Sequence, residues 1–219
     1  MMKVRLKYCG NKSLTDLQVA CNSNADYIGV IFAESKRKVY AEDLSRWLVQ
    51  VDLQTKELVG VFVNGTADEI ANVVSRVPLS IIQCHGTESA EQLIEIKSII
   101  NLPIWKAIHH SDDALEVMRS LRGIVDGFVI DSKVKGMWGG TGITFDWNRV
   151  GDYMLEADSQ GVPCFIAGGI TPQNISTLLQ FHPNGIDLSS GIEVDGIKNK
   201  QLVRELEERL GLYEASSRS

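Results

Sequence analysis

The sequence predicts a single (β/α)8 barrel, a TIM barrel of the α/β class, over residues 1–212, followed by a frayed tail at residues 213–219. Short apolar runs typical of β-strands recur along the chain, and segments of helical period separate them. Eight such units in 219 residues leave little room for a second domain. An open doubly wound sheet is the alternative, but no GxGxxG fingerprint follows the first run.

Most of the predicted strands are apolar on both faces, as expected for a buried parallel sheet. They are Val4–Tyr8, Tyr27–Phe32, Leu58–Val63, Ser80–Gln83, Ile104–Ile108, Gly127–Ile130, Cys164–Ala167 and Gly185–Leu188. Helices are predicted between them, and Ser13, Thr66 and Thr171-Pro172 are expected to cap or begin three of these helices. Trp105 in the fifth strand is expected to face outward onto the helices.

Composition limits the classes of function. The formal net charge of -6 argues against a general nucleic-acid binder, although backbone N–H groups at a helix start still suit a small anion. The cysteines Cys9, Cys21, Cys84 and Cys164 show neither CxxC spacing nor a histidine cluster, so reduced thiols are expected rather than disulfides or a metal site. No signal peptide and no membrane-spanning run are recognised, and we expect a cytoplasmic protein without a membrane partner.

The catalytic end of such a barrel is formed by the carboxyl ends of the strands, and two ionisable residues stand there. Cys9 ends the first run and shares a strand face with Lys7, whose ammonium would favour a thiolate; the alternative is a buried structural cysteine. Asp131 follows the sixth run as a candidate general acid, or as a cap of the next loop. The two strands are expected on opposite sides of the barrel, so that Cys9 and Asp131 face each other across its mouth.

Two loops have the composition of a phosphate site. They follow the seventh and eighth runs, where backbone N–H groups and serine hydroxyls can hold a phosphate. The residues are Gly168, Gly169, Ser189, Ser190 and Gly191.

Three further positions have two open interpretations each. Gly140 and Gly142 belong to a Gly-rich stretch that forms either a mobile flap over a substrate or a flexible connection only. Arg37 follows the second run, either in a solvated basic turn or as a fork that holds a carboxylate. His85 ends the fourth run and either orients a substrate or bonds a neighbouring loop.

Ordered motifs between Lys3 and about Leu210 carry a family resemblance. They are Lys7-Tyr-Cys-Gly10, Gly29-Val-Ile-Phe32, Ser35-Lys-Arg-Lys-Val39, Val59-Gly-Val-Phe-Val-Asn64, Gln83-Cys-His-Gly86, Asp131-Ser-Lys133, Gly139-Gly-Thr-Gly-Ile-Thr-Phe-Asp-Trp147, Ala167-Gly-Gly-Ile-Thr-Pro-Gln-Asn174 and Asp187-Leu-Ser-Ser-Gly-Ile-Glu193. With these motifs the chain resembles the phosphoribosylanthranilate isomerase family of tryptophan biosynthesis.

The resemblance implies a barrel of the ribulose-phosphate-binding type and a cofactor-free, metal-free Amadori rearrangement. N-(5-phosphoribosyl)anthranilate would become 1-(2-carboxyphenylamino)-1-deoxyribulose 5-phosphate. It implies Cys9 as general base, Asp131 as general acid, and Arg37 on the anthranilate carboxylate. The phosphate would lie on the glycines after strands six and seven, with Ser189, Ser190 and Gly191. The expected partner is thus a phosphorylated small molecule, and the expected state is a monomer or a homodimer.

Rival functions fit the residues less well. An indole-glycerol-phosphate synthase would need a lysine in the third strand, and Leu58–Asn64 has none. A related isomerase of histidine synthesis would carry paired aspartates, and a regulatory barrel that only binds phosphate needs neither Cys9 nor Asp131. The chain also departs from the common family pattern, because the loop before Ser35 is one residue shorter and Asn199 replaces an aspartate at the start of the last helix.

Overall fold

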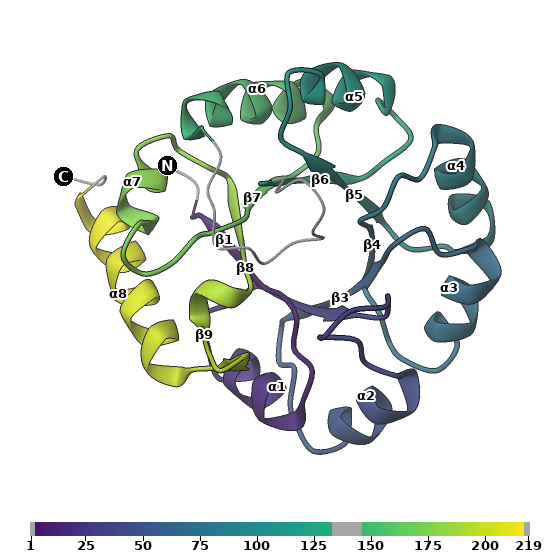
Figure 1. Ribbon diagram of the computed structural model, residues 1–219, viewed down its shortest axis with the longest axis horizontal. Helices are drawn as coiled ribbons and strands as arrows, with labels where there is room; N and C mark the ends of the chain where they lie inside the picture. The colour runs from purple at the N-terminus through teal and green to yellow at the C-terminus, as the bar shows by residue number, and fades with distance from the viewer. Residues whose placement is uncertain (1–2, 133–145, 217–219) are drawn as a thin grey trace.

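The computed structural model describes residues 3–132 and 146–216 (Figure 1). The strands form one closed parallel barrel in the order β1 to β8, which confirms the predicted fold. Their bounds lie within one residue of the predicted runs. The strands are β1 (Arg5–Tyr8), β2 (Tyr27–Ile31), β3 (Glu57–Phe62), β4 (Ile81–Cys84), β5 (Ile104–His109), β6 (Gly127–Asp131), β7 (Cys164–Ala167) and β8 (Gly185–Leu188).

The helices form an outer ring around the strands (Figure 1). The described α-helices are α1 (Leu14–Cys21), α2 (Ala41–Leu48), α3 (Ala67–Val74), α4 (Ala90–Ile99), α5 (Ala114–Ser120), α6 (Val150–Gln160), α7 (Ile175–Leu179) and α8 (Lys200–Ser216). Short 3-10 helices are η1 (Trp147–Arg149) and η2 (Ser190–Ile192). None of the helices described is long and apolar enough to cross a bilayer. The boundary of a tail at residues 213–219 stays a prediction, since α8 continues to Ser216.

Helix starts follow the predicted caps with one exception. Ser13 and Thr66 accept hydrogen bonds from the backbone N–H three residues on, and Thr66 forms a full capping box. Asn199, the departure noted above, still caps α8, because its Oδ1 accepts hydrogen bonds from the backbone N–H groups of Gln201 and Leu202. The predicted start at Thr171-Pro172 is wrong: Asn174 is the cap of α7, and its Oδ1 accepts the Thr171 N–H at 2.8 Å.

An aromatic layer fills the barrel near the amino ends of the strands. The rings of Tyr27, Trp105 and Phe165 pack with centroids 4.8–5.4 Å apart, and a Cβ on Gly127 would lie 2.5 Å from Trp105. The prediction that Trp105 faces outward is therefore wrong. Neighbouring residues of a strand alternate between faces, so the inward Trp105 places Lys106 on the outer face.

Lys106 and Glu88 form a buried ion pair that ties the loops after β3 and β4 together. Their Nζ and Oε2 atoms are 2.8 Å apart. The Glu88 carboxylate also accepts from Asn64 N at 2.8 Å and from Gly86 N at 3.0 Å. Lys106 Nζ donates to Gly86 O at 2.8 Å. Lys106 Nζ also lies 3.4 Å from Cys84 O, so the network holds the chain on both sides of His85, which begins the loop after β4.

The ion pair between Glu88 and Lys106 should make the stability of the fold depend on pH. Burial alone would raise the pKa of Glu88, but the Lys106 ammonium and the hydrogen bonds to the carboxylate lower it below its ordinary value of 4.5. A depressed carboxyl pKa stabilises the fold above the unfolded-state pKa, and this contribution is lost as the pH falls through the folded-state pKa. We expect Glu88→Gln to lower the free energy of unfolding at pH 7 by about 3–5 kcal/mol, because it leaves a buried ammonium uncompensated.

Urea denaturation at pH 7 and at steps below pH 4.5 measures this effect. The difference between wild type and Glu88→Gln should shrink as the pH falls. The control is Glu95→Gln on the exposed face of α4, which should change stability by less than about 0.5 kcal/mol. A loss for Glu88→Gln that is equally large at every pH would contradict the ionic account.

Candidate active site

Cys9 follows β1 directly, and its thiol lies beside the ammonium of Lys7. A Cβ on Gly29 of β2 would lie 2.8 Å from Cys9 Sγ and 3.1 Å from Lys7 Nζ, so glycine leaves the space that both groups fill. Lys7 Nζ in turn donates to Asp187 Oδ2 of β8 at 2.8 Å. All three side chains are buried. The structure therefore brings the thiol next to an ion pair inside the barrel.

Opposed effects set the pKa of Cys9. Burial raises the pKa of the thiol, the Lys7 charge lowers it, and the Asp187 charge raises it again. The net pKa is above the ordinary value, so the resting group is the thiol. The sequence correctly predicted the direction of the Lys7 effect, but burial outweighs it. The other cysteines pack in the core, as predicted; burial raises the pKa of Cys84 to about 12.

Asp131 ends β6 and is contacted by His85, which follows β4 and is itself bonded to Gln83 of β4. His85 Nε2 is 3.3 Å from Asp131 Oδ2, and His85 Nδ1 is 2.9 Å from Gln83 Nε2. With the Gln83 amide donating to Nδ1, Nε2 carries the imidazole proton and donates it to the carboxylate. The other oxygen faces the loop after β7, since a Cβ on Gly168 would lie 2.8 Å from Asp131 Oδ1. His85 thus contacts the candidate acid itself, and Gln83 is a partner that sequence reasoning missed.

The ring order corrects one expectation about this pair. Going round the barrel from β1, the path to β6 crosses β8 and β7, so β5 rather than β6 stands opposite β1. Cys9 and Asp131 therefore flank the mouth instead of facing each other across its full width. Asp187 lies on β8 between them, and its Oδ1 is buried without a hydrogen-bond partner among the described residues.

The loops after β7 and β8 meet at one side of the mouth. Gly168 and Gly169 have φ of +91° and +63°, which only glycine adopts readily. A Cβ on Gly191 would lie 1.8 Å from Ile170 O, so the two loops are in backbone contact. Ser189 and the start of η2 follow β8 directly. The predicted phosphate residues are thus brought together, whereas Gly140 and Gly142 lie outside the described residues and stay a prediction.

Arg37 does not lie in a solvated turn. Its Nε and Nη2 donate to Glu193 Oε1 and Oε2 at 3.2 and 2.7 Å, and its side chain is only 9% exposed. A Cβ on Gly10, which has φ of +78°, would lie 2.6 Å from Arg37 Cδ. The guanidinium therefore reaches the mouth beside Cys9, and the shorter loop before Ser35 does not prevent it. Sequence reasoning missed Glu193, although the Asp195-Gly196 turn signal just after it predicts a hairpin.

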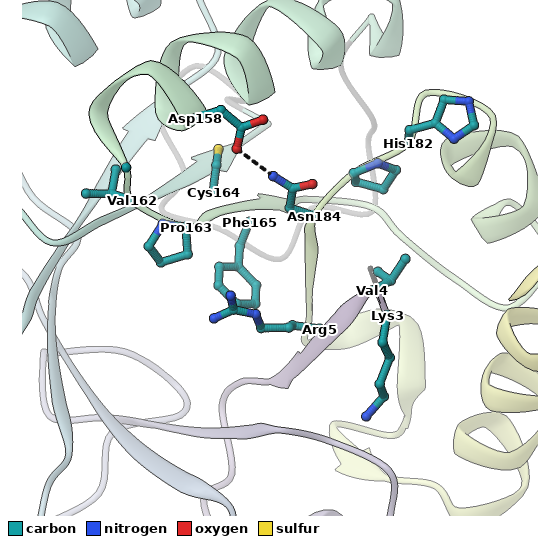
Figure 2. A pocket seen from close by; sticks show the side chains of 12 residues that line it. Lys3, Val4, Arg5, Asp158, Val162, Pro163, Cys164, Phe165, His182 and Asn184 are labelled. Carbon is teal, nitrogen blue, oxygen red and sulfur yellow. Dashed lines mark hydrogen bonds between the residues drawn. The ribbon is translucent and has the colours of Figure 1, made fainter. Parts of the chain in front are cut away.

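The pocket of about 320 Å³ shown in Figure 2 lies at the other end of the barrel. Residues 3–5, 161–165 and 182–184 line it together with Asp158, whose Oδ1 accepts from Asn184 at 3.1 Å. These segments lie at the amino ends of β1, β7 and β8, and no predicted site residue belongs to them. In the described part of the chain, no three His, Cys, Asp or Glu side chains are grouped to hold a metal ion. The chemistry-bearing residues gather at the carboxyl ends instead.

Comparisons with known proteins agree on one family. The model of the family described as N-(5'-phosphoribosyl)anthranilate (PRA) isomerase matches residues 6–209. The N-(5'-phosphoribosyl)anthranilate isomerase of Geobacillus thermodenitrificans is 54% identical, with 97% of this chain and 96% of that protein covered. The Bacillus subtilis enzyme of the same name is 47% identical, with 97% and 98% covered.

Solved structures match over nearly the whole chain. The Thermotoga maritima phosphoribosyl anthranilate isomerase is 29% identical with a TM-score of 0.80, covering 95% of this chain and 98% of its own. A structure of the isomerase with reduced 1-(o-carboxyphenylamino)-1-deoxyribulose 5-phosphate is 27% identical, with a TM-score of 0.78 and the same coverage. The family match and the barrel mouth agree: the chain belongs to the N-(5'-phosphoribosyl)anthranilate isomerase family.

Proposed function

We propose that the chain converts N-(5'-phosphoribosyl)anthranilate into 1-(2-carboxyphenylamino)-1-deoxyribulose 5-phosphate, in tryptophan biosynthesis. The proposal rests on two side chains at the mouth of the barrel. A buried thiol after β1 and a buried carboxyl group on β6 flank it, in a chain of this isomerase family. An acid and a base at such positions suit a reaction that moves protons at two places on one sugar.

The proposed reaction opens the ribose ring and then moves a proton from C2. Asp131 protonates the ring oxygen of the ribose, and the C1–O bond breaks. The lone pair of the anilinic nitrogen then forms an iminium ion at C1. Cys9, as thiolate, removes the proton on C2 to give an enolamine. The enolamine then tautomerises to the ketone: water protonates C1 and takes the hydroxyl proton, and exchange with water returns Cys9 to the thiolate and Asp131 to the acid.

The surroundings of each group support its role. The Lys7 ammonium beside Cys9 stabilises the thiolate that the proton abstraction requires. The His85 N–H binds Oδ2 of Asp131, and Oδ1 is the oxygen that would carry the proton toward the substrate. Acid and base thus have different environments, as a reaction that needs one neutral and one charged group requires.

Arg37 is proposed to bind the anthranilate carboxylate. We expect Arg37→Met to raise KM roughly 10–150-fold, since a hydrogen bond to a charged group is worth about 1.5–3 kcal/mol. Steady-state kinetics measures the change, and kcat should change much less. If the variant also binds a product analogue that lacks the carboxylate more weakly than wild type does, Arg37 supports the fold instead of the ligand.

The same proposal covers partners and location. Phosphorylated small molecules are the proposed ligands, and the negative net charge of -6 supports the absence of nucleic-acid binding. A Thermotoga maritima relative is named as dimeric, and we propose a monomer or a homodimer for this chain, acting in the cytoplasm.

Turnover by the purified chain tests the proposed function. Incubation with N-(5'-phosphoribosyl)anthranilate should consume the C2 proton signal and produce the ketone, both followed by NMR. Tight binding of the reduced product analogue without any turnover would contradict the proposal. That result would instead identify a barrel that only binds the phosphorylated ligand.

A further inference from the structure

A short hairpin after β8 lies outside the barrel pattern. It consists of β9 (Glu193–Val194) and β10 (Ile197–Lys198), which pair antiparallel with Lys198 opposite Glu193. The turn residues Asp195 and Gly196 have φ of +52° and +73°, as a two-residue turn with two left-handed positions requires. Lys198 N donates to Asp16 Oδ1 of α1 at 2.8 Å, which fixes the hairpin on the barrel.

Glu193 and Lys198 of the hairpin form a buried ionic cluster with Arg37. The Glu193 carboxylate accepts hydrogen bonds from Arg37 and also from Lys198 Nζ, the latter at 2.6 Å. The side chains of Arg37, Glu193 and Lys198 are 9%, 4% and 1% exposed. Two cations therefore share one carboxylate in a place with little water. One positive charge is left over, and a buried uncompensated charge favours binding of an anion.

The geometry shows where that anion fits. A guanidinium has two edges that fork a carboxylate, one formed by Nε and Nη2 and the other by Nη1 and Nη2. Glu193 occupies the first edge of Arg37. Among the described residues no hydrogen bond of Nη1 is found. Within the described part of the chain the second edge is thus available, and glycine at position 10 leaves the space that the Arg37 side chain fills beside Cys9.

We propose that Glu193 is a positioning residue: it holds the Nε–Nη2 edge of Arg37 so that the opposite edge receives the carboxylate of the substrate. This rests on the proposed function, in which Arg37 binds that carboxylate. Lys198 keeps Glu193 in place from the far side of the cluster. The positive charge that remains is directed at the mouth.

The protonation of Glu193 agrees with this role, and although burial lowers the pKa of Lys198, the Glu193 carboxylate opposes that effect. Burial alone would raise the pKa of Glu193, but the Arg37 hydrogen bond and the Lys198 charge lower it below its ordinary value. Glu193 is therefore an anion at neutral pH, as a hold on a guanidinium requires.

A double-mutant cycle tests the inference, with KM and kcat measured for Glu193→Gln, Arg37→Met and both changes together. We expect Glu193→Gln to raise KM about tenfold, the loss of one charged hydrogen-bond partner, with little change in kcat. In the Arg37→Met background, Glu193→Gln should cause no further rise in KM. For a substrate analogue without the carboxylate, Glu193→Gln should have no effect. The control is Glu156→Gln on α6, a carboxylate paired with Arg119 and Arg122 away from the mouth, which should leave KM unchanged.

The outcomes separate this inference from the proposed function. No rise in KM for Arg37→Met would remove the carboxylate role of Arg37. A rise for Arg37→Met, with Glu193→Gln adding the same factor in both backgrounds, would overturn only the positioning role. If Glu193→Gln does not fold, Glu193→Asp serves, because it keeps the charge and shortens the side chain. We expect Glu193→Asp to raise KM several-fold with a near-native Tm; an unchanged KM would contradict the inference.

Discussion

Asparagine in place of Asp131 is expected to lower kcat by roughly 10²–10⁴-fold with a modest change in KM, the usual cost of losing a general acid. Asn keeps the shape of the side chain and an oxygen that accepts the His85 N–H, but it has no acidic proton to transfer. Cys9→Ser should cost a similar factor, because a hydroxyl is far less acidic than the thiol and provides no thiolate. Steady-state kinetics with N-(5'-phosphoribosyl)anthranilate measures both effects.

The pH profile identifies the base more specifically. Since Cys9 must be deprotonated to act and its pKa is raised, kcat/KM should rise with pH as the thiol titrates above its ordinary value. That limb of the profile should disappear in Cys9→Ser. Cys21→Ala is the matched control, because this buried thiol packs in α1 away from the mouth. Near wild-type kcat in Cys9→Ser or Asp131→Asn would remove that residue from the mechanism.

A methyl group on Gly191 should disrupt the phosphate site. In Gly191→Ala the new Cβ would lie 1.8 Å from Ile170 O, a backbone atom, so the loops after β7 and β8 must move apart. We expect kcat/KM to fall by about 10²-fold or more, the cost of misplacing a bound substrate by about 1 Å. Gly191→Val, with its larger side chain, should lower kcat/KM by at least as much. Gly151→Ala is the control, since a Cβ there would meet nothing within 4 Å.

Dephosphorylated substrate separates phosphate binding from damage to the fold. Wild type should process it poorly, because the phosphate no longer positions the sugar between Cys9 and Asp131. Gly191→Ala should then show little further loss. Inorganic phosphate should raise the Tm of wild type more than that of the variant. Equal kcat/KM for phosphorylated and dephosphorylated substrate in wild type would show that these loops hold no phosphate.

The strands were predictable because a parallel barrel buries both faces of each strand. Runs such as Leu58–Val63 are therefore apolar throughout and end where polar loops begin. The rule that barrel sites form at carboxyl ends then selects Cys9 and Asp131 without any structure. The family resemblance supplied the roles of these residues and of Arg37, which position alone left open.

What the sequence did not predict depends on contacts between distant segments. Whether Trp105 faces inward follows from the register of β5 against its neighbours, and an apolar run does not reveal that register. The partnership of Arg37 with Glu193 joins residues far apart in the chain through a two-residue turn. Likewise, the contact of His85 with Asp131 depends on the spacing of β4 and β6 around the barrel. Local sequence patterns determine the strands and helices, whereas these contacts between distant residues form only when the barrel closes.

A crystal structure with reduced 1-(o-carboxyphenylamino)-1-deoxyribulose 5-phosphate tests the central claim most directly. The phosphate should contact Gly169 and the backbone of Ser190 and Gly191, and the carboxylate should lie on the Nη1–Nη2 edge of Arg37. The sugar chain should pass between Cys9 and Asp131. The analogue bound in the pocket at the amino ends of β1, β7 and β8, with the mouth unoccupied, would contradict the account.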